Sequence, residues 1–146
     1  MHIPHYTDAT HQPWLPLDEN LPGVMVKYLR IDVSSAETVS LLRMPAHMHL
    51  PRHRHIGPVT VYTLEGSWRY LEHDWIAQPG SLIWEPAGSC HSPLTLDSES
   101  GTVTTLNMVQ GDLEILNRHG KVVAIENCDT AMARQDRAKS TQGVSA

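Results

Sequence analysis

The sequence lacks phenylalanine, an excess of basic residues and any long apolar run. These absences restrict the side chains that can form the core and the classes of partner that the protein can bind. Without phenylalanine, the 146 residues must build a core from Trp, Leu, Val, Ile and Met. The formal net charge is −5 at pH 7, so we expect no basic patch for nucleic-acid phosphates. No apolar run approaches the roughly 20 residues of a membrane-spanning helix, and the first residues do not resemble a signal peptide. The two cysteines, Cys90 and Cys128, form no Cys-x-x-Cys pair. The composition predicts a cytoplasmic protein with reduced thiols that binds neither nucleic acid nor membrane.

Short apolar segments separated by prolines and other turn residues fill most of the chain, which is typical of antiparallel β proteins. Strands are expected at 24–31, 38–44, 53–64, 67–72, 81–84, 91–96, 101–109, 113–116 and 121–125. Consecutive strands are expected to pair as hairpins: 53–64 with 67–72, 91–96 with 101–109, and 113–116 with 121–125. Residues 1–22 read as an irregular arm, 130–139 as a helix and 140–146 as a frayed tail. We therefore predict one all-β domain over residues 1–128, followed by a helix and tail over 129–146.

Histidine is abundant, with ten residues in the chain. His53 and His55 lie two apart, so on a strand their side chains share one face, with α-carbons roughly 6–7 Å apart. Both imidazoles can then reach one metal at about 2.0–2.1 Å. A third ligand must come from elsewhere, and His91 stands where the chain re-enters the sheet after a Pro-Ala-Gly turn. The sequence predicts a metal site formed by these three histidines.

Two further histidines, His47 and His49, have the same strand parity, so a set of His49, His53 and His55 is a rival. Prolines on both sides of His47 and His49 interrupt the strand ladder there, which favours a place at the rim.

The two histidine segments together resemble the motifs of the cupin superfamily. The first motif, Gly-x5-His-x-His-x3,4-Glu-x6-Gly, corresponds to residues 47–66, and the second, Gly-x5-Pro-x-Gly-x2-His-x3-Asn, to residues 80–95. The resemblance implies a double-stranded β-helix, the cupin jelly-roll barrel, with the irregular arm before it and a short C-terminal helix after it. The chain departs from the motifs at His47, at Thr95 and, above all, at Val59, which replaces the glutamate ligand.

A site of three neutral imidazoles leaves a divalent ion its full charge and open positions for dioxygen or an anionic chelator. In this respect the chain resembles the three-histidine cupins that include acetylacetone-cleaving and 2,4′-dihydroxyacetophenone dioxygenases, themselves similar to the ChrR cupin domain. That resemblance implies an Fe(II) enzyme, with Zn(II) or Ni(II) as other occupants, that cleaves a C–C bond of a β-diketone or aromatic hydroxyketone with O2. It also implies an acidic residue near the metal, for which Glu85 is the candidate. One of Arg69 and Tyr70, which follow Gly66 on the strand beside the histidine pair, is expected to contact the substrate, and Arg69 is taken as the candidate. A homodimer or higher homo-oligomer is expected by analogy.

Each of these candidates also has an explanation that involves no function. Glu85 then is an exposed carboxylate at a strand end, and Arg69 is an outward-facing strand residue. The rival function is a non-catalytic zinc-binding module of the ChrR type. Other cupin enzyme classes, an isomerase or a small-thiol dioxygenase, also remain open.

Overall fold

Twelve strands, one short 3-10 turn and one helix make up the structure, a computed structural model that describes residues 3–144 and, for 142–144, the backbone only. The strands are β1 (Leu15–Pro16), β2 (Met25–Asp32), β3 (Glu37–Pro45), β4 (His53–His55), β5 (Val59–Glu65), β6 (Trp68–Tyr70), β7 (Leu82–Glu85), β8 (Cys90–His91), β9 (Pro93–Thr95), β10 (Thr102–Gln110), β11 (Leu113–Leu116) and β12 (Val122–Glu126). The 3-10 turn is η1 (Ala9–His11) and the helix is α1 (Cys128–Val144). The predicted all-β architecture with a C-terminal helix is confirmed.

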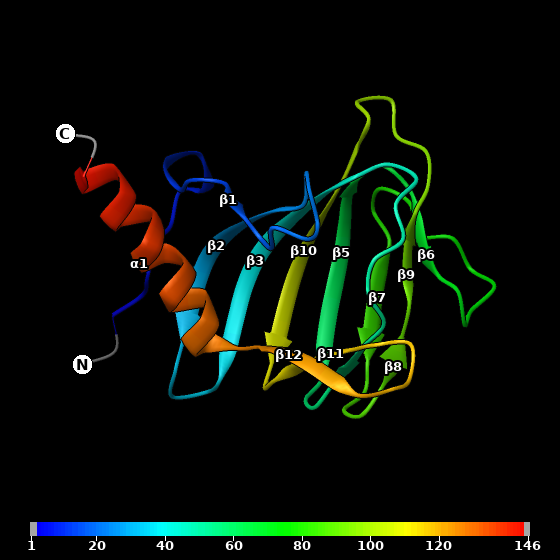
Figure 1. The fold of residues 1–146 in the computed structure, drawn as a ribbon. Helices are drawn as coiled ribbons and strands as arrows, with labels where there is room; N and C mark the ends of the chain where they lie inside the picture. Colours follow the sequence, from blue (N-terminus) through cyan, green and yellow to red (C-terminus); the bar gives the residue numbers. More distant parts are fainter. Residues whose placement is uncertain (1–2, 145–146) are drawn as a thin grey trace.

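The strands form two main antiparallel sheets that face each other (Figure 1). One has six strands in the order β1-β2-β3-β10-β5-β7, and the other has four in the order β12-β11-β4-β8. A two-stranded β6-β9 ladder extends the smaller layer. This is the two-sheet arrangement of a jelly roll.

The alternation of side chains along the strands builds the core between the sheets. On β5, Val59, Val61 and Thr63 are buried while the residues between them are more exposed, as a period of two requires. On β10, Val103 and Thr105 are likewise buried, while the residues next to them along the strand are more exposed. Trp68 and Tyr70, from β6, close the same cluster. Because Phe is absent, these two aromatic rings and the branched aliphatic side chains fill the interior.

The expected single strand over 53–64 is wrong, because the chain breaks at Gly57-Pro58 into β4 and β5, which belong to different sheets. Gly57 lies so close to the Gln110 carbonyl that a β-carbon there would collide with it. Pro58 has no N–H to donate to a ladder. The break lets β4 join the four-stranded sheet while β5 continues in the six-stranded one.

Two of the three expected hairpins are also wrong. The segment after Gly66 pairs as β6 with β9, while β10 lies between β3 and β5. Gly66 has a φ of 75°, and a β-carbon there would stand 2.8 Å from Val103 Cγ2, so the chain turns away from β5 at this point. Long-range pairing therefore overrides adjacency in sequence. The third hairpin, β11 with β12, is confirmed.

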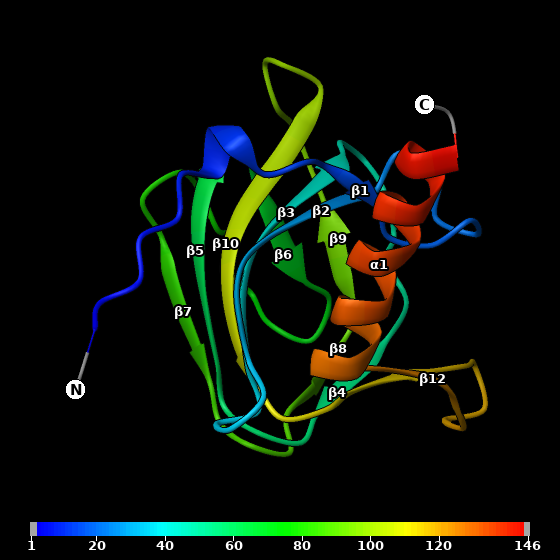
Figure 2. The same cartoon turned by 90° about the vertical axis from the view of Figure 1, so that its left-hand side faces the viewer.

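The helix begins earlier and runs further than expected. Asn127 caps it, because its side-chain oxygen accepts a hydrogen bond from the Thr130 N–H at 3.1 Å. The tail predicted to fray from residue 140 continues as helix to Val144, and residues 145–146 lie outside the described part. Ala131 packs with Val26 and Tyr28, so α1 closes the side of the sandwich next to β2 (Figure 2).

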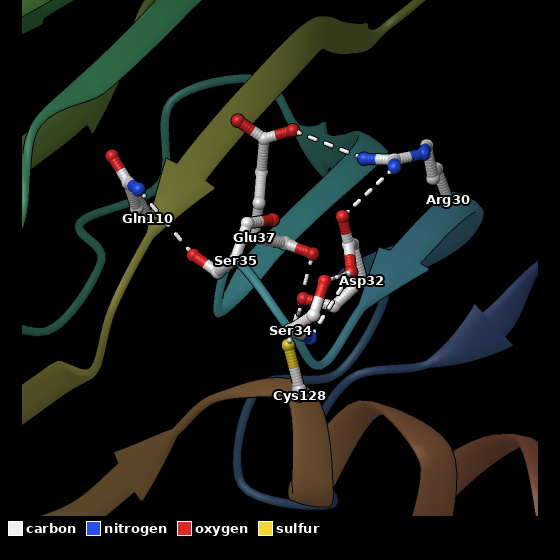
Figure 3. A network of polar contacts seen from close by, with 7 residues as sticks. All are labelled: Arg30, Asp32, Ser34, Ser35, Glu37, Gln110 and Cys128. Atoms are coloured by element: carbon white, nitrogen blue, oxygen red, sulfur yellow. Dashed lines mark hydrogen bonds and ion pairs between the residues drawn. The ribbon is translucent and has the colours of Figure 1, made fainter. Parts of the chain in front are cut away.

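A polar network joins the start of α1 to the β2–β3 turn (Figure 3). The Arg30 guanidinium donates to Asp32 at 2.8 Å and to Glu37 at 3.4 Å. The Cys128 sulfur lies 3.7 Å from the carbonyl oxygens of Asp32 and Glu37. Gln110 donates to the Ser35 carbonyl at 3.3 Å, which ties the end of β10 to the same turn. Cys128 is a free, buried thiol in this contact.

The arm before β1 covers part of the outer face of the six-stranded sheet. The Trp14 ring lies under the Lys27 ammonium and the Arg43 guanidinium, at 4.8 and 4.3 Å from the ring centre. Lys27 also donates to the Ala9 carbonyl at 2.8 Å. Figure 2 shows the arm, in blue, crossing the upper ends of β10 and β5. Among the described residues, none of the helices is both long and apolar enough to cross a bilayer.

Candidate metal centre

Two strands of the smaller sheet bring the three predicted histidines together. His53 and His55 share a face of β4, and His53 lies directly opposite His91 of β8 in the antiparallel register. The Pro86–Gly88 turn before β8 is held to β4, since Gly88 N–H donates to the His55 carbonyl at 2.7 Å and His55 N–H to the Ser89 carbonyl at 2.9 Å. Backbone hydrogen bonds therefore fix the spacing between the pair and the third histidine.

The three imidazoles converge on one point. Their ring centres are 4.7 Å apart for His53–His55, 4.6 Å for His53–His91 and 5.2 Å for His55–His91. One ring nitrogen from each lies within 4.8 Å of the others. Ligand atoms about 2 Å from a common ion must lie within about 4 Å of one another, so a small adjustment closes this triangle around a cation. The group suggests a metal site.

The protonation state of the three imidazoles suits metal binding. The pKa is lowered to about 4 for His53, to about 3 for His55 and to about 2 for His91; burial is the main cause, and neighbouring imidazoles contribute to the lowering for His55 and His91. The rings are therefore neutral at pH 7. His53 Nδ1 lies 3.2 Å from the Pro51 carbonyl, which can only accept, so Nδ1 carries the proton and Nε2 offers a lone pair.

Buried polar atoms that lack hydrogen-bond partners gather at the histidine cluster. Among the described residues, His55 Nδ1 and His91 Nε2 are buried without a hydrogen-bond partner, and so are both carboxylate oxygens of Glu85. Such atoms are costly to bury unless something binds them. Three neutral nitrogen donors and an adjacent carboxylate fit a divalent transition-metal ion.

Glu85 enters the cluster from the other sheet. It is 4% exposed, and its Oε2 lies 3.4 Å from His55 Nε2 and 3.3 Å from His91 Nε2. Burial raises its pKa to about 7, an effect that the nearby Tyr70 hydroxyl partly offsets. In the β5–β7 ladder Glu85 lies directly opposite Val59, the position at which the cupin motif carries its glutamate. A neighbouring strand therefore places a carboxylate beside the position that lacks one.

Tyr70 is a site residue that the sequence indicated only as one of two choices with Arg69. Its ring stacks on His91 with centres 3.8 Å apart and planes 18° from parallel. Trp68 and Tyr70 are buried while Arg69 between them is not. The Arg69 guanidinium donates to the carbonyls of Tyr70 at 3.4 Å and His73 at 2.5 Å, so it braces the turn after β6.

The two rival histidines lie apart from the cluster. His47 is in the left-handed region, with a φ of 58°, and its exposed ring contacts Asp97 at 2.9 Å. His49 forms a bridge with Leu94. The group that could hold a metal ion among the described residues includes neither of them, so the structure favours His53, His55 and His91 over the set built on His49.

Two cavities meet at the histidine cluster. A cavity of about 570 Å³ lies between the sheets, with His53 and His55 in its wall. A second, of about 450 Å³, includes His91 and Glu85. Tyr70 lines both. The cluster is thus open to a large interior space on one side and to a smaller cleft on the other.

Comparisons with known proteins agree with this architecture. Residues 3–112 match the family described as the ChrR cupin-like domain. An RmlC-like cupin protein from Ralstonia eutropha JMP134 is 41% identical, with a TM-score of 0.87, over 93% of this chain and 87% of its own. A cupin-like protein of unknown function from the same strain is 26% identical, with a TM-score of 0.85, over 97% of this chain and 91% of its own.

An acetylacetone dioxygenase from Acinetobacter johnsonii has the same fold, with 17% identity and a TM-score of 0.81 over 92% of each chain. No curated protein sequence matches the chain. The predicted cupin jelly roll is confirmed by the fold of these structures. The match of residues 3–112 to the family model establishes that the protein belongs to the ChrR cupin-like domain family.

Proposed function

We propose that the protein is an Fe(II)-dependent dioxygenase that cleaves a C–C bond of a small β-diketone or an aromatic hydroxyketone. The observation that carries the proposal is the buried group of His53, His55 and His91, with three neutral nitrogen donors and an apolar cavity beside them. The shared fold of the acetylacetone dioxygenase from Acinetobacter johnsonii supports it. In the overall reaction both atoms of O2 enter the two carbonyl-containing fragments, so no other reductant is required.

The three histidines would hold the metal, with His53 donating through Nε2 because its Nδ1 is committed to the Pro51 carbonyl. Fe(II), when bound, supplies Lewis acidity and the activation of dioxygen. Tyr70, stacked on His91, fixes the plane of that ring and therefore the direction of its lone pair.

Glu85 is the group we propose as proton acceptor. A diketone or hydroxyketone must lose a proton before it reacts as an enolate, and a carboxylate within reach of the site can receive it. The Glu85 Oε2 atom lies within 3.4 Å of two of the imidazoles, so any substrate bound beside them is close to this oxygen. Its burial keeps water from competing for the proton.

The test of this proposal is oxygen uptake by Fe(II)-loaded protein on addition of pentane-2,4-dione or 2-hydroxyacetophenone, with the products identified by mass spectrometry: one acid and one ketoaldehyde from the diketone, and two acids from the hydroxyketone. Replacing His53, His55 or His91 by Ala is expected to remove both bound iron and turnover, because each variant loses one of only three protein donors. His47→Asn is the matched control and should keep both, since His47 is exposed and paired with Asp97. Full iron stoichiometry in all three Ala variants would refute the metal site.

A non-catalytic zinc-binding module is the second candidate, and the family description favours it because it names ChrR. The same three histidines would then bind Zn(II) without turnover. Zinc in purified protein does not decide between the two, because affinity order favours zinc over iron in expression hosts. Absence of oxygen uptake by fully Fe(II)-loaded protein, across both ketone classes, would favour the zinc module.

A further inference from the structure

The large cavity offers more room than a compact diketone needs. Its volume of about 570 Å³ is within the range of sites that enclose drug-sized ligands. Aliphatic and aromatic side chains form most of its wall, among them Leu42, Val61 and Trp68. Such a wall favours a ligand with an extended apolar body.

A pair of polar side chains interrupts this apolar wall on the six-stranded sheet. Asn107 of β10 and Ser40 of β3 lie directly opposite each other in the ladder, and both line the cavity. In antiparallel sheets such partners have β-carbons about 4.5–5.5 Å apart, close enough to contact the same ligand atom. The histidines come from the facing sheet, so the pair and the metal site lie on opposite walls.

The hydrogen bonds of this pair leave one acceptor and one hydroxyl free. The Asn107 side-chain N–H2 donates to Thr105 Oγ1 at 2.9 Å and to the Thr105 carbonyl at 3.3 Å, which fixes the amide with its oxygen free. Among the described residues, neither Asn107 Oδ1 nor Ser40 Oγ has a hydrogen-bond partner in the protein. Ser40 is 8% exposed, so its hydroxyl faces a confined space. Together the two offer an acceptor and a donor.

The charged side chains around the cavity disfavour an anionic ligand group at the wall formed by Asn107 and Ser40. The charged side chains in the lining, other than histidine, are the acidic Asp18 and Glu126. Among the described residues the lining contains no Lys or Arg, and the guanidinium of Arg134 behind the lining already donates to Glu126 at 2.7 Å and to the Tyr28 hydroxyl at 2.6 Å. A ligand carboxylate would therefore be desolvated without a cation, whereas a hydroxyl can both donate and accept.

We propose that Asn107 and Ser40 form a recognition site for a neutral hydroxyl group on a ligand whose ketone end faces the histidines. This deepens the proposed function, on which the orientation of the ketone end rests, and it selects aromatic hydroxyketones over simple diketones. The Asn107 amide oxygen accepts from the ligand hydroxyl, and the Ser40 hydroxyl donates to it.

The experiment measures binding by calorimetry to metal-free protein, so its readout does not depend on turnover. The ligands are 4-hydroxyacetophenone, acetophenone and 4-carboxyacetophenone. The wild type should bind the hydroxylated ketone about tenfold more tightly than acetophenone, as expected for a buried hydrogen-bonded hydroxyl, and the carboxylate most weakly. Asn107→Leu should abolish the preference, and Ser40→Ala should reduce it.

The matched control is Asn20→Leu, the same change at another asparagine that lines the cavity, and it should keep the preference. Circular dichroism of each variant establishes that it is folded. Equal binding of the two ketones, no binding of either, or a preference that survives in folded Asn107→Leu would overturn the inference. If the preference holds but Fe(II)-loaded protein consumes no oxygen, the proposed function fails and the recognition site stands.

Discussion

At the scale of single residues, Glu85 changes the chemistry that the sequence motif alone implies. The motif has Val59 where cupins carry a glutamate, which predicts a first coordination sphere without a carboxylate. Glu85 reaches the same place from the neighbouring strand, opposite Val59. Its Oε2 lies close to the ring nitrogens of His55 and His91 but is not among the three mutually close ligand atoms. These distances are also short enough for coordination of a shared ion, so proton transfer is our proposal for Glu85 and metal binding is the alternative that the following variants separate.

This assignment predicts different effects on metal content and on rate. Glu85→Gln should keep bound iron near the wild-type level, because the three histidines are intact, while kcat falls by about 100-fold for want of a proton acceptor. Glu114→Gln is the matched control. Glu114 pairs with Arg54 within the four-stranded sheet that carries the histidines, but it lies outside the histidine cluster. Metal analysis and steady-state kinetics of both variants provide the measurement. Loss of iron from Glu85→Gln would instead make Glu85 a ligand.

At the scale of elements, the break between β4 and β5 positions the site. It sends His53 and His55 into one sheet and Val59 into the other, so the site lies between layers. Gly57 permits the break because the Gln110 backbone takes the space of a side chain. The sequence shows a Gly-Pro pair here, but apolar and β-branched residues on both sides resemble one continuous strand.

Gly57→Ala is therefore expected to destabilise the protein by at least about 2 kcal/mol, because the new β-carbon meets rigid backbone. It should also weaken metal binding, since relief of the clash moves β4. Gly120→Ala serves for comparison: its β-carbon meets nothing within 4 Å, and its φ of 78° carries a strain of about 1 kcal/mol far from the histidines. Chemical denaturation and metal titration give the two readouts. Equal effects of the two substitutions would contradict the role given to Gly57.

At the scale of the whole molecule, the outer face of the six-stranded sheet carries a group of exposed apolar side chains. Large side chains point outward from its strands β5, β7 and β10, and the following are at least 37% exposed: Tyr62, Leu64, Leu82, Trp84 and Met108. The register places Tyr62 beside Leu82 and Thr60 beside Trp84, so the patch is continuous across strands. Trp14 of the arm contacts Lys27 of β2 and Arg43 of β3, and the arm also includes the exposed Ile3 and Tyr6. Exposed apolar patches of this kind mark interaction sites.

The homodimer expected from family analogy remains a prediction, and this face is where we place it. A two-fold pair would bury the same patch on each copy. Light scattering should give twice the 16.3 kDa chain mass for the wild type and the single mass for Leu82→Glu. Val123→Glu, at a similarly exposed position on β12, should leave the dimer intact. A wild-type mass of one chain would refute the dimer.

The sequence by itself determined the features that depend on local stereochemistry. Two histidines two residues apart must share a face of a strand, and a Pro-Ala-Gly turn must return the chain to the sheet at His91. Only the tertiary structure decided which strands pair, and with that the place of Glu85 opposite Val59, the stacking of Tyr70 on His91 and the pairing of Asn107 with Ser40. Strand pairing depends on contacts between segments far apart in the chain, and the period-two pattern within a strand shows which face is buried but not which strand lies beside it.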